Sequence, residues 1–477
     1  MMYGEEKSDS LIVAANLANN PQGAESVERR SGAKGNAEQP HMRRTQSRES
    51  MSQRLSRVRE AAKQRKKERF TALFHLLTAE ALENAFLSLS RKAAAGVDGV
   101  RWKDYAENLK VNIADLHRRL HQGSYRAQPG RRHYIPKADG KQRPLGIASL
   151  EDKIVQYALV KILNAVYEND FMGFSYGFRP GRSQHNALDA LATGLVRTNV
   201  NWVLDADISQ FFDKVSHEWL IRFIEHRIGD QRVIRLIRKW LTAGTSEEGE
   251  WRASEEGTPQ GAVISPLLAN IYLHYVFDLW AHQWRRRHAT GNVVMVRYAD
   301  DIVIGFDKRI DAQCFRIAMQ RRLKEFGLTV HPKKTRLMEF GRFAAENRAS
   351  RGKGKPETFN FLGFTHISGK DRSGRFMLIR KTRRDRMTAT LKAIKDGLRK
   401  RWHYSIPEQG KWLRRVVQGY LNYHSVPGNY PMMRKFRIYV TDLWRRALRR
   451  RSQQDDTTWT KANRLAAVWL PKVRVLH

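Results

Sequence analysis

Cysteine is nearly absent from this 477-residue sequence, in which Cys314 is the single example. One cysteine cannot build a disulfide framework, and it cannot supply the ligands of a cysteine-based zinc site. The sequence also lacks any run of 18 apolar residues, so a transmembrane helix is not expected. Its first residues have neither the charged start nor the continuous apolar core of a signal peptide. These absences predict an intracellular, cytoplasmic protein that no membrane segment anchors.

Acidic residues are few in comparison with basic ones. The chain has 87 Lys and Arg against 48 Asp and Glu, which gives a formal net charge of +39. The excess extends along the whole chain, so it is not the local solvated charge run that many proteins carry. A polyanionic partner explains it most simply, and we expect nucleic acid rather than an anionic membrane surface.

Composition divides the chain into three parts. Residues 1–53 are polar with little apolar periodicity, which predicts a disordered extension. Residues 54–375 begin with a basic helical stretch and then alternate apolar runs with helical patterns, as mixed α/β domains do. Residues 376–477 have a helical and strongly basic pattern, with 20 Lys or Arg and 4 Asp or Glu between Lys381 and Arg451.

Two adjacent carboxylates interrupt an apolar segment. Residues 292–306 (NVVMVRYADDIVIGF) contain runs rich in β-branched residues on either side of Asp300 and Asp301. This pattern predicts two strands joined by a tight turn. Carboxylates held in such a turn repel each other, and partial burial adds a desolvation cost, so a cation should lie nearby. The simpler alternative is a polar hairpin tip, because Asp is a common turn residue.

A second acidic segment, residues 201–213 (NWVLDADISQFFD), comes earlier in the chain. Asp205 and Asp207 are two residues apart, so they share one face of a predicted strand. The alternative is that one of them caps the following helix, although Asp213 or Ser216 could do so instead. Carboxylates from two strand ends can converge on a pair of Mg²⁺ ions about 3.5–4 Å apart, the arrangement of two-metal phosphoryl transfer.

These segments resemble the palm motifs of reverse transcriptases. Residues 298–301 (YADD) are similar to the YxDD signature in the form common to group II intron proteins, and residues 206–213 are similar to the first palm motif. The resemblance implies attack of a primer 3′-hydroxyl on the α-phosphate of a dNTP. It favours Asp207 over Asp205, because the family's ligand immediately precedes Ile. The implied catalytic residues are Asp207, Asp300 and Asp301, and the implied ligands of two Mg²⁺ ions are Asp207, Ile208, Asp300 and Asp301.

The resemblance also implies a dNTP site. Arg143 matches the fingers motif whose basic residues hold the incoming triphosphate, and Lys137 is a second candidate. A solvated surface hairpin would carry the same residues. Gln260, within the segment GTPQG, matches the position beside the templating base, although an ordinary loop-to-helix junction also uses Pro and Gly. Lys334, within LTVHPKKT, matches a lysine near the triphosphate.

Two further motifs concern the sugar and the primer. Phe212 follows Asp207 by five residues, where the family has an aromatic ring that excludes a ribose 2′-hydroxyl. A core phenylalanine would look the same in the sequence, and Phe211 is the candidate for that role. The segment FNFLGF resembles the primer-grip hairpin, whose candidate residues here are Phe361, Leu362 and Gly363. His185 matches the segment before the first palm strand, and we expect a structural role for it.

The C-terminal part has the pattern of a helix with one apolar face. Phe436, Val440 and Leu443 share that face, and most arginines fall elsewhere on the helix. A solvated basic face is the alternative to RNA binding. The region resembles the thumb and maturase region of group II intron proteins. Since Cys314 is the only cysteine, we expect no Cys-rich endonuclease module, so a DNA primer would come from elsewhere. The candidate RNA-binding residues are Arg434, Arg437, Arg445, Arg446, Arg449 and Arg450.

The sequence therefore predicts an α/β (α+β) right-hand polymerase, with fingers and palm in residues 54–375 and an all-α thumb/maturase domain in residues 376–477. Its expected function is RNA-directed DNA synthesis, with binding of its group II intron RNA for splicing and for retromobility by target-primed reverse transcription. Expected partners are that RNA, an RNA template, a DNA primer or target, and dNTPs; a homodimer is left open. The alternatives are a domesticated enzyme in defence or beside a CRISPR system, and an RNA-binding splicing factor with a dormant polymerase.

Overall fold

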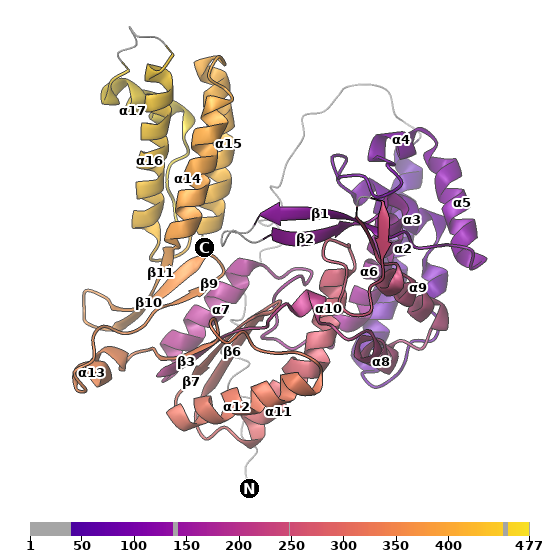
Figure 1. The fold of residues 1–477 in the computed structure, drawn as a ribbon, viewed down its shortest axis with the longest axis horizontal. Coiled ribbons are helices and arrows are strands. Elements are labelled where there is room, and N and C mark those ends of the chain that lie inside the picture. Colours follow the sequence, from indigo (N-terminus) through magenta and orange to yellow (C-terminus); the bar gives the residue numbers. More distant parts are fainter. Residues whose placement is uncertain (1–39, 137–141, 248, 452–456, 477) are drawn as a thin grey trace.

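The computed structural model describes residues 40–136, 142–247, 249–451 and 457–476 (Figure 1). Two hydrophobic cores organise them. The larger core gathers buried side chains from Ala62 to Phe364 and adds Leu378 and Val426. A separate core among the C-terminal helices runs from Met387 to Leu470. The chain is thus a mixed α/β protein with a large helical share, and that part of the fold prediction is confirmed.

An antiparallel sheet of four strands lies within the larger core, with the order β6-β7-β3-β8 (Figure 1). Nearly every residue of β6 and β7 is buried, as expected for apolar strands covered on both faces. The register pairs Asp207 with Asp301, and Tyr298 with Asp301. We call this the central sheet; its strands are β3 (Trp202–Asp207), β6 (Val293–Tyr298), β7 (Asp301–Phe306) and β8 (Arg336–Glu339).

Helices cover the central sheet. Helix α7 (Gln184–Arg197) packs so closely on β6 that a Cβ at Gly194 would lie 2.4 Å from Cγ1 of Val294. Helix α12 (Arg309–Glu325) contacts β3 and β7. Helix α10 (Ser265–Leu273) continues through a π-helical turn, His274–Asp278, into α11 (Leu279–Arg287). Such π turns are rare and frequently occur at functional sites.

A mainly helical layer beside the central sheet carries a second sheet with the order β2-β1-β4-β5. Its first two strands form an antiparallel hairpin, and β4 joins β1 in parallel. The strands are β1 (Gly130–Pro136), β2 (Gln142–Ile147), β4 (Thr245–Glu247) and β5 (Glu250–Arg252). The helices are α3 (Ala79–Ser88), α4 (Trp102–Glu107), α5 (Leu109–His121), α6 (Leu150–Tyr167), α8 (His217–Arg227) and α9 (Gln231–Thr242).

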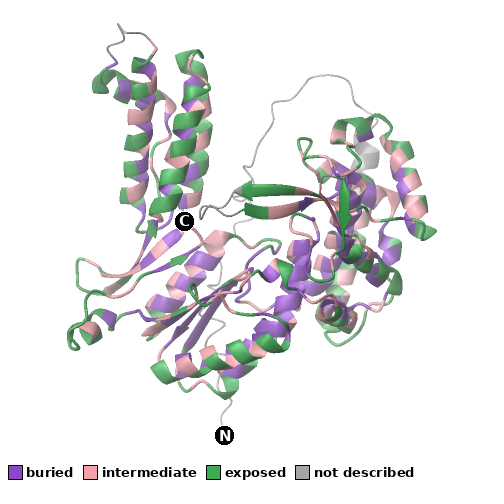
Figure 2. Ribbon diagram, viewed as in Figure 1, coloured by how far each residue is buried: buried purple, intermediate pink, exposed green. Residues whose placement is uncertain are grey.

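The C-terminal part forms a helical bundle above a third sheet, with the order β11-β10-β9 (Figure 1). Buried and exposed residues alternate around the bundle helices, as their amphipathic pattern predicts (Figure 2). A capping box between Ser405 and Glu408 begins α15. The elements are β9 (Phe359–Phe361), β10 (Phe364–Lys370), β11 (Phe376–Thr382), α14 (Arg384–Arg399), α15 (Ile406–His424), α16 (Tyr430–Arg449) and α17 (Trp459–Trp469).

The structure differs from the predicted boundaries in two places. Residues 376–382 form strand β11, because Leu378, Arg380 and Thr382 alternate inward and pair with β10, so the helices begin only at Arg384. Helix α2 (Pro40–Gln64) includes residues of the extension predicted to be disordered, while residues 1–39 lie outside the described part. Among the described residues, no helix combines the length and the apolar character that a membrane crossing requires.

Candidate active site

Three carboxylates predicted to act together lie at one end of the central sheet. Asp207 ends β3 and stands opposite Asp301, which begins β7. Asp300 lies in the two-residue turn that joins β6 to β7. Segments distant in the sequence therefore present their carboxylates side by side, because the antiparallel register of β3 and β7 aligns the two strand ends.

The hairpin turn is held in a conformation that few side chains adopt. Ala299 has a φ of 56°, in the left-handed region that non-glycine residues rarely occupy. The loop around Gly177 packs directly on this turn, since a Cβ on that glycine would lie 2.3 Å from the backbone N of Ala299. The turn is thus fixed by close backbone contact, and it cannot shift without moving the neighbouring loop.

A buried ion pair supports the turn of Ala299 and Asp300 from inside the protein. Arg297 and Asp278 are both fully buried, and Nε of Arg297 donates to Oδ1 of Asp278 over 2.7 Å. The guanidinium also donates to the carbonyl of Ala299 over 3.0 Å and to Oγ of Ser175 over 2.7 Å. Asp278 ends the π-helical turn, so this irregular turn supplies the partner that keeps a charged arginine inside an apolar strand.

The crowded carboxylates are difficult to ionise together. Burial, together with the charges of Asp300 and Asp207, raises the pKa of Asp301 to about 7. Burial, followed by the charge of Asp207, also raises the pKa of Asp300. Asp205 lies on the same face of β3, and burial together with Asp301 raises its pKa to about 7. A cation is needed if all these groups are to be charged at neutral pH.

Lys334 provides one such cation. Its Nζ lies 2.7 Å from Oδ2 of Asp207, and this hydrogen bond raises the pKa of the lysine. The expected cation beside the carboxylates is therefore present, contributed by the segment before β8. Within the described ranges, no set of three or more His, Cys, Asp or Glu side chains is gathered closely enough to hold a metal ion.

The donor chemistry nevertheless fits a hard divalent cation. All the side-chain donors are carboxylate oxygens, and they repel one another. The backbone carbonyl of Ile208 adds a donor for a cation, because the bridge between Ile208 and Val330 is closed by bonds from Ser209 N to Thr329 O and from His331 N to Asp207 O. Those two bonds use neither polar backbone group of Ile208.

Three polar side chains from separate segments form a chain beside the carboxylates. Nε of Arg143, on β2, donates to Oε1 of Gln260 over 3.0 Å. Nε2 of Gln260 donates to Oδ1 of Asp213 over 2.7 Å. Because a carboxylate only accepts, Asp213 fixes which end of the Gln260 amide faces Arg143. Lys137, the second basic candidate of this group, lies outside the described residues.

The two adjacent phenylalanines have different environments. Phe211 is 2% exposed and belongs to the larger core, whereas Phe212 is only partly buried. The backbone of Phe212 is held in place, since its carbonyl accepts from Thr258 N over 2.7 Å. Gly257, with a φ of 86°, lies so close that a Cβ would be 2.8 Å from that carbonyl. Phe211 is therefore the core phenylalanine, and Phe212 packs against the core while it stays partly exposed.

The segment predicted to grip a primer is a tight turn between β9 and β10. Leu362 and Gly363 have φ values of 46° and 80°, while Phe361 is buried. Tyr423, on α15, donates its hydroxyl to the carbonyl of Leu362 over 3.0 Å. The backbone carbonyl of Tyr423 lies 2.9 Å from Nε2 of His185 on α7. The turn thus sits where the C-terminal bundle meets the larger core, and the bond from His185 agrees with its expected structural role.

The candidate RNA-binding arginines lie on α16, apart from Arg450 directly after it, and they differ in exposure and in partners. Arg434, Arg449 and Arg450 are exposed. Arg437 instead donates to the carbonyls of Pro471 and Ala466 and ties α16 to the chain end around α17. Arg445 and Arg446 share Asp442, over 3.0 Å and 2.7 Å.

Sequence reasoning did not select several residues that shape this site. Asp213 was considered only as a helix cap, yet it orients Gln260. Arg297 could have been selected from the sequence, because it is a charged residue within an otherwise apolar predicted strand. Its partner Asp278 carried no such signal, since only the tertiary fold brings them together. Tyr423 carried no signal in the sequence either, because its contact with Leu362 depends on how the bundle meets the larger core.

Comparison with known proteins supports the resemblance. Residues 135–366 match the family "Reverse transcriptase (RNA-dependent DNA polymerase)". Protein YkfC of Escherichia coli is 43% identical over 206 residues, which cover 42% of this chain and 54% of that protein. The group II intron-encoded protein LtrA of Lactococcus lactis is 37% identical over 223 residues, covering 46% of this chain and 37% of LtrA.

A longer match reaches the putative COX1/OXI3 intron 1 protein of Saccharomyces cerevisiae. It is 26% identical over 393 residues, which cover 68% of this chain and 46% of that protein. The matched segments therefore span about half or less of the length of these relatives. The similarity to group II intron-encoded reverse transcriptases and maturases, predicted from the motifs, is confirmed.

Proposed function

We propose that this chain, whose residues 135–366 match the reverse transcriptase family, is an RNA-directed DNA polymerase that also binds a group II intron RNA. The observation that carries the proposal is the meeting of Asp207 with the Asp300–Asp301 hairpin at one end of the central sheet. In this proposal the central sheet is the palm, the helical layer with β1 and β2 is the fingers, and α14–α17 form the thumb and maturase domain.

The proposed reaction is attack of a primer 3′-hydroxyl on the α-phosphate of a dNTP, which forms a new phosphodiester and releases pyrophosphate. Asp207, Asp300, Asp301 and the carbonyl of Ile208 would hold two Mg²⁺ ions. When bound, these ions activate the hydroxyl and stabilise charge on the leaving oxygen. Lys334 now neutralises Asp207, and its position suits it to bind a triphosphate oxygen once that carboxylate has another partner.

The residues around the carboxylates would position the nucleotide. Arg143 offers a planar donor fork suited to phosphate oxygens. Gln260, held by Asp213, would contact the base pair or the sugar. Phe212 would stand beneath the sugar, where a rigid ring leaves no room for a 2′-hydroxyl. The turn of Leu362 and Gly363 would support the primer end, because Tyr423 fixes it against the bundle.

The intron partner is proposed from charge and from the relatives. Two of the similar proteins are named as a group II intron-encoded protein and a nuclear intron maturase. The exposed arginines of α16 give this chain a surface for RNA phosphates, so affinity should fall steeply with salt. We include assistance of intron splicing and target-primed reverse transcription in the proposed function.

Primer extension on an RNA template with Mg²⁺ and dNTPs tests the proposal. The wild-type protein should extend a DNA primer, and Asp300→Ala should abolish extension while it leaves RNA affinity within about twofold, because the lost group serves chemistry. A folded wild-type protein that makes no DNA would end the polymerase claim. Equal loss of extension and RNA binding in Asp300→Ala would identify the carboxylate as structural.

A further inference from the structure

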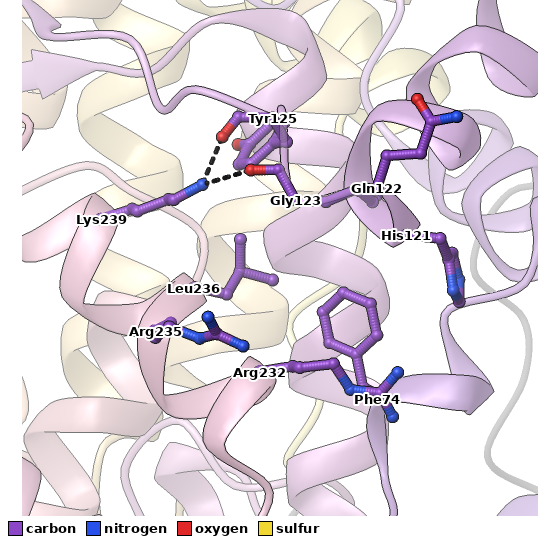
Figure 3. A pocket seen from close by; sticks show the side chains of 10 residues that line it. Phe74, His121, Gln122, Gly123, Tyr125, Arg232, Arg235, Leu236 and Lys239 are labelled. Atoms are coloured by element: carbon purple, nitrogen blue, oxygen red, sulfur yellow. Dashed lines mark hydrogen bonds between the residues drawn. The ribbon is translucent and has the colours of Figure 1, made fainter.

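A cavity of about 350 Å³ opens on the outer side of the helical layer, between α9 and the end of α5 (Figure 3). Basic side chains reach into it from successive turns of α9, namely Arg232, Arg235 and Lys239. The opposite wall carries Phe74 and His121. In Figure 1 these helices lie on the side of the molecule away from the C-terminal bundle. The cavity is therefore separate from the acidic end of the central sheet.

The walls of this cavity contain no acidic side chain among the described residues that form them. Among the described residues, Asp230 is the carboxylate that lies within ion-pair distance of these cations, 3.7 Å from Nε of Arg232. Its Oδ2 already accepts from the backbone N of Leu73 and of Phe74, over 2.9 Å and 2.8 Å. The cavity consequently has an excess of positive charge, because the single carboxylate of Asp230 offsets only part of it.

The three basic side chains of the cavity differ in the contacts that they make with the rest of the protein. Nζ of Lys239 donates to the carbonyls of Tyr125 and Gly123, over 2.5 Å and 3.3 Å, and so joins α9 to the segment after α5 (Figure 3). The guanidinium of Arg232 lies 4.8 Å above the ring of Phe74. Arg235 has no hydrogen bond or ion pair within the described part of the chain, and its head group is available to a ligand.

A second cavity beside the same helix provides an internal contrast. It is lined by Arg238 of α9, by Arg222 of α8 and by two glutamates, Glu218 and Glu225. Arg238 lies 3.3 Å from Glu225, and Arg222 lies 2.7 Å from Glu218. On one side of α9 the arginine is thus paired with a glutamate of the protein, whereas on the other side Arg235 has no such partner among the described residues and is left for an external anion.

We propose that the cavity with Arg232 and Arg235 binds a phosphodiester of RNA outside the polymerase active site. Guanidinium groups match phosphate oxygens in geometry and charge. A volume of about 350 Å³ is at the small end of ligand sites, so it admits one nucleotide unit and excludes a duplex. The inference rests on the proposed RNA binding, and it adds a second, remote point of attachment for that RNA.

Binding of a labelled single-stranded RNA of mixed sequence, measured against salt concentration, tests this site. Arg235→Gln should weaken binding several-fold at low salt and reduce the slope of log K against log salt by about 0.7, the value for one phosphate contact on a single strand. Arg238→Gln removes the same charge from the same helix and should leave the slope unchanged. Equal slopes for the two variants would overturn the site.

Arginine modification by phenylglyoxal, read by mass spectrometry, locates the contact and its ligand. RNA should protect Arg235 and leave Arg238 reactive. Inorganic phosphate alone should not protect Arg235; equal protection by it would identify a free-phosphate site and overturn the RNA assignment, as would no protection by RNA. Single-nucleotide extension of a preannealed primer by Arg235→Gln should match the wild type, so failure of this site and failure of the polymerase are distinguishable.

Discussion

The candidate site has a buried part, here called the floor, and a surface part, here called the rim, and the two differ in how their charged groups are paired. The floor comprises Arg297 and Asp278, both fully buried, together with Asp205 on β3. The rim comprises Arg143 and Gln260, which are connected by a single hydrogen bond at the surface. The charges of Arg297 and Asp278 are fixed by their mutual ion pair, whereas a nucleotide can recruit the charge of Arg143. The floor should therefore govern folding, and the rim should govern substrate affinity.

The largest effect should come from separating the buried pair of the floor. Asp278→Ala leaves Arg297 charged, buried and without its carboxylate, which typically costs about 3–5 kcal/mol of the free energy of unfolding. Denaturant unfolding measures this loss. Glu218→Ala breaks the exposed pair with Arg222 and should cost less than about 1 kcal/mol. Similar losses in the two variants would remove the distinction between floor and surface charges.

The sequence predicts the hairpin well and its support poorly. Apolar runs rich in β-branched residues on either side of Asp300 and Asp301 suffice to predict two strands and a turn, because these preferences are local. The pairing of Asp207 with Asp301 depends on strand order, and the motif resemblance supplied it. Nothing local links Arg297 to Asp278 or Asp213 to Gln260. The strand β11 was missed because its basic residues, such as Arg380 and Lys381, resemble those of the helices that follow.

A smaller effect should come from the rim. Asp213→Ala frees the amide of Gln260 to rotate, so its donor and acceptor no longer face a nucleotide in one orientation. We expect the KM for dNTP to rise roughly threefold to tenfold, since a hydrogen bond to a charged group contributes about 1.5–3 kcal/mol when buried and less at the surface. The kcat and the unfolding free energy should change little. Steady-state primer extension at varied dNTP concentration measures KM and kcat separately.

Two variants separate orientation from charge at the rim. Asp213→Asn keeps an acceptor for Gln260 and should recover most of the affinity for dNTP. Glu256→Gln removes a neighbouring exposed carboxylate that pairs with Lys214, and it should have no effect on KM. If Glu256→Gln raises KM as much as Asp213→Ala does, the effect arises from general electrostatics, and Asp213 has no positioning role.

The smallest effect should be a pH-dependent change in stability at the floor. Burial and Asp301 raise the pKa of Asp205 to about 7 in the folded protein, against about 3.9 in an unfolded chain. Between these values the folded state holds a proton that the unfolded state has lost, so this group reduces stability as pH rises from about 4 to about 7. Asp205→Asn removes that penalty. Its melting temperature relative to wild type should therefore increase across this interval and level off above it, in thermal unfolding without divalent ions.

Asp371 provides a control with the opposite sign, because hydrogen bonds from Arg375 lower its pKa. Asp371→Asn should therefore lose stability relative to wild type as pH rises through the low-pH range. A difference between Asp205→Asn and wild type that stays constant from pH 4 to 7 would mean that Asp205 ionises normally, and that the floor does not desolvate its carboxylates.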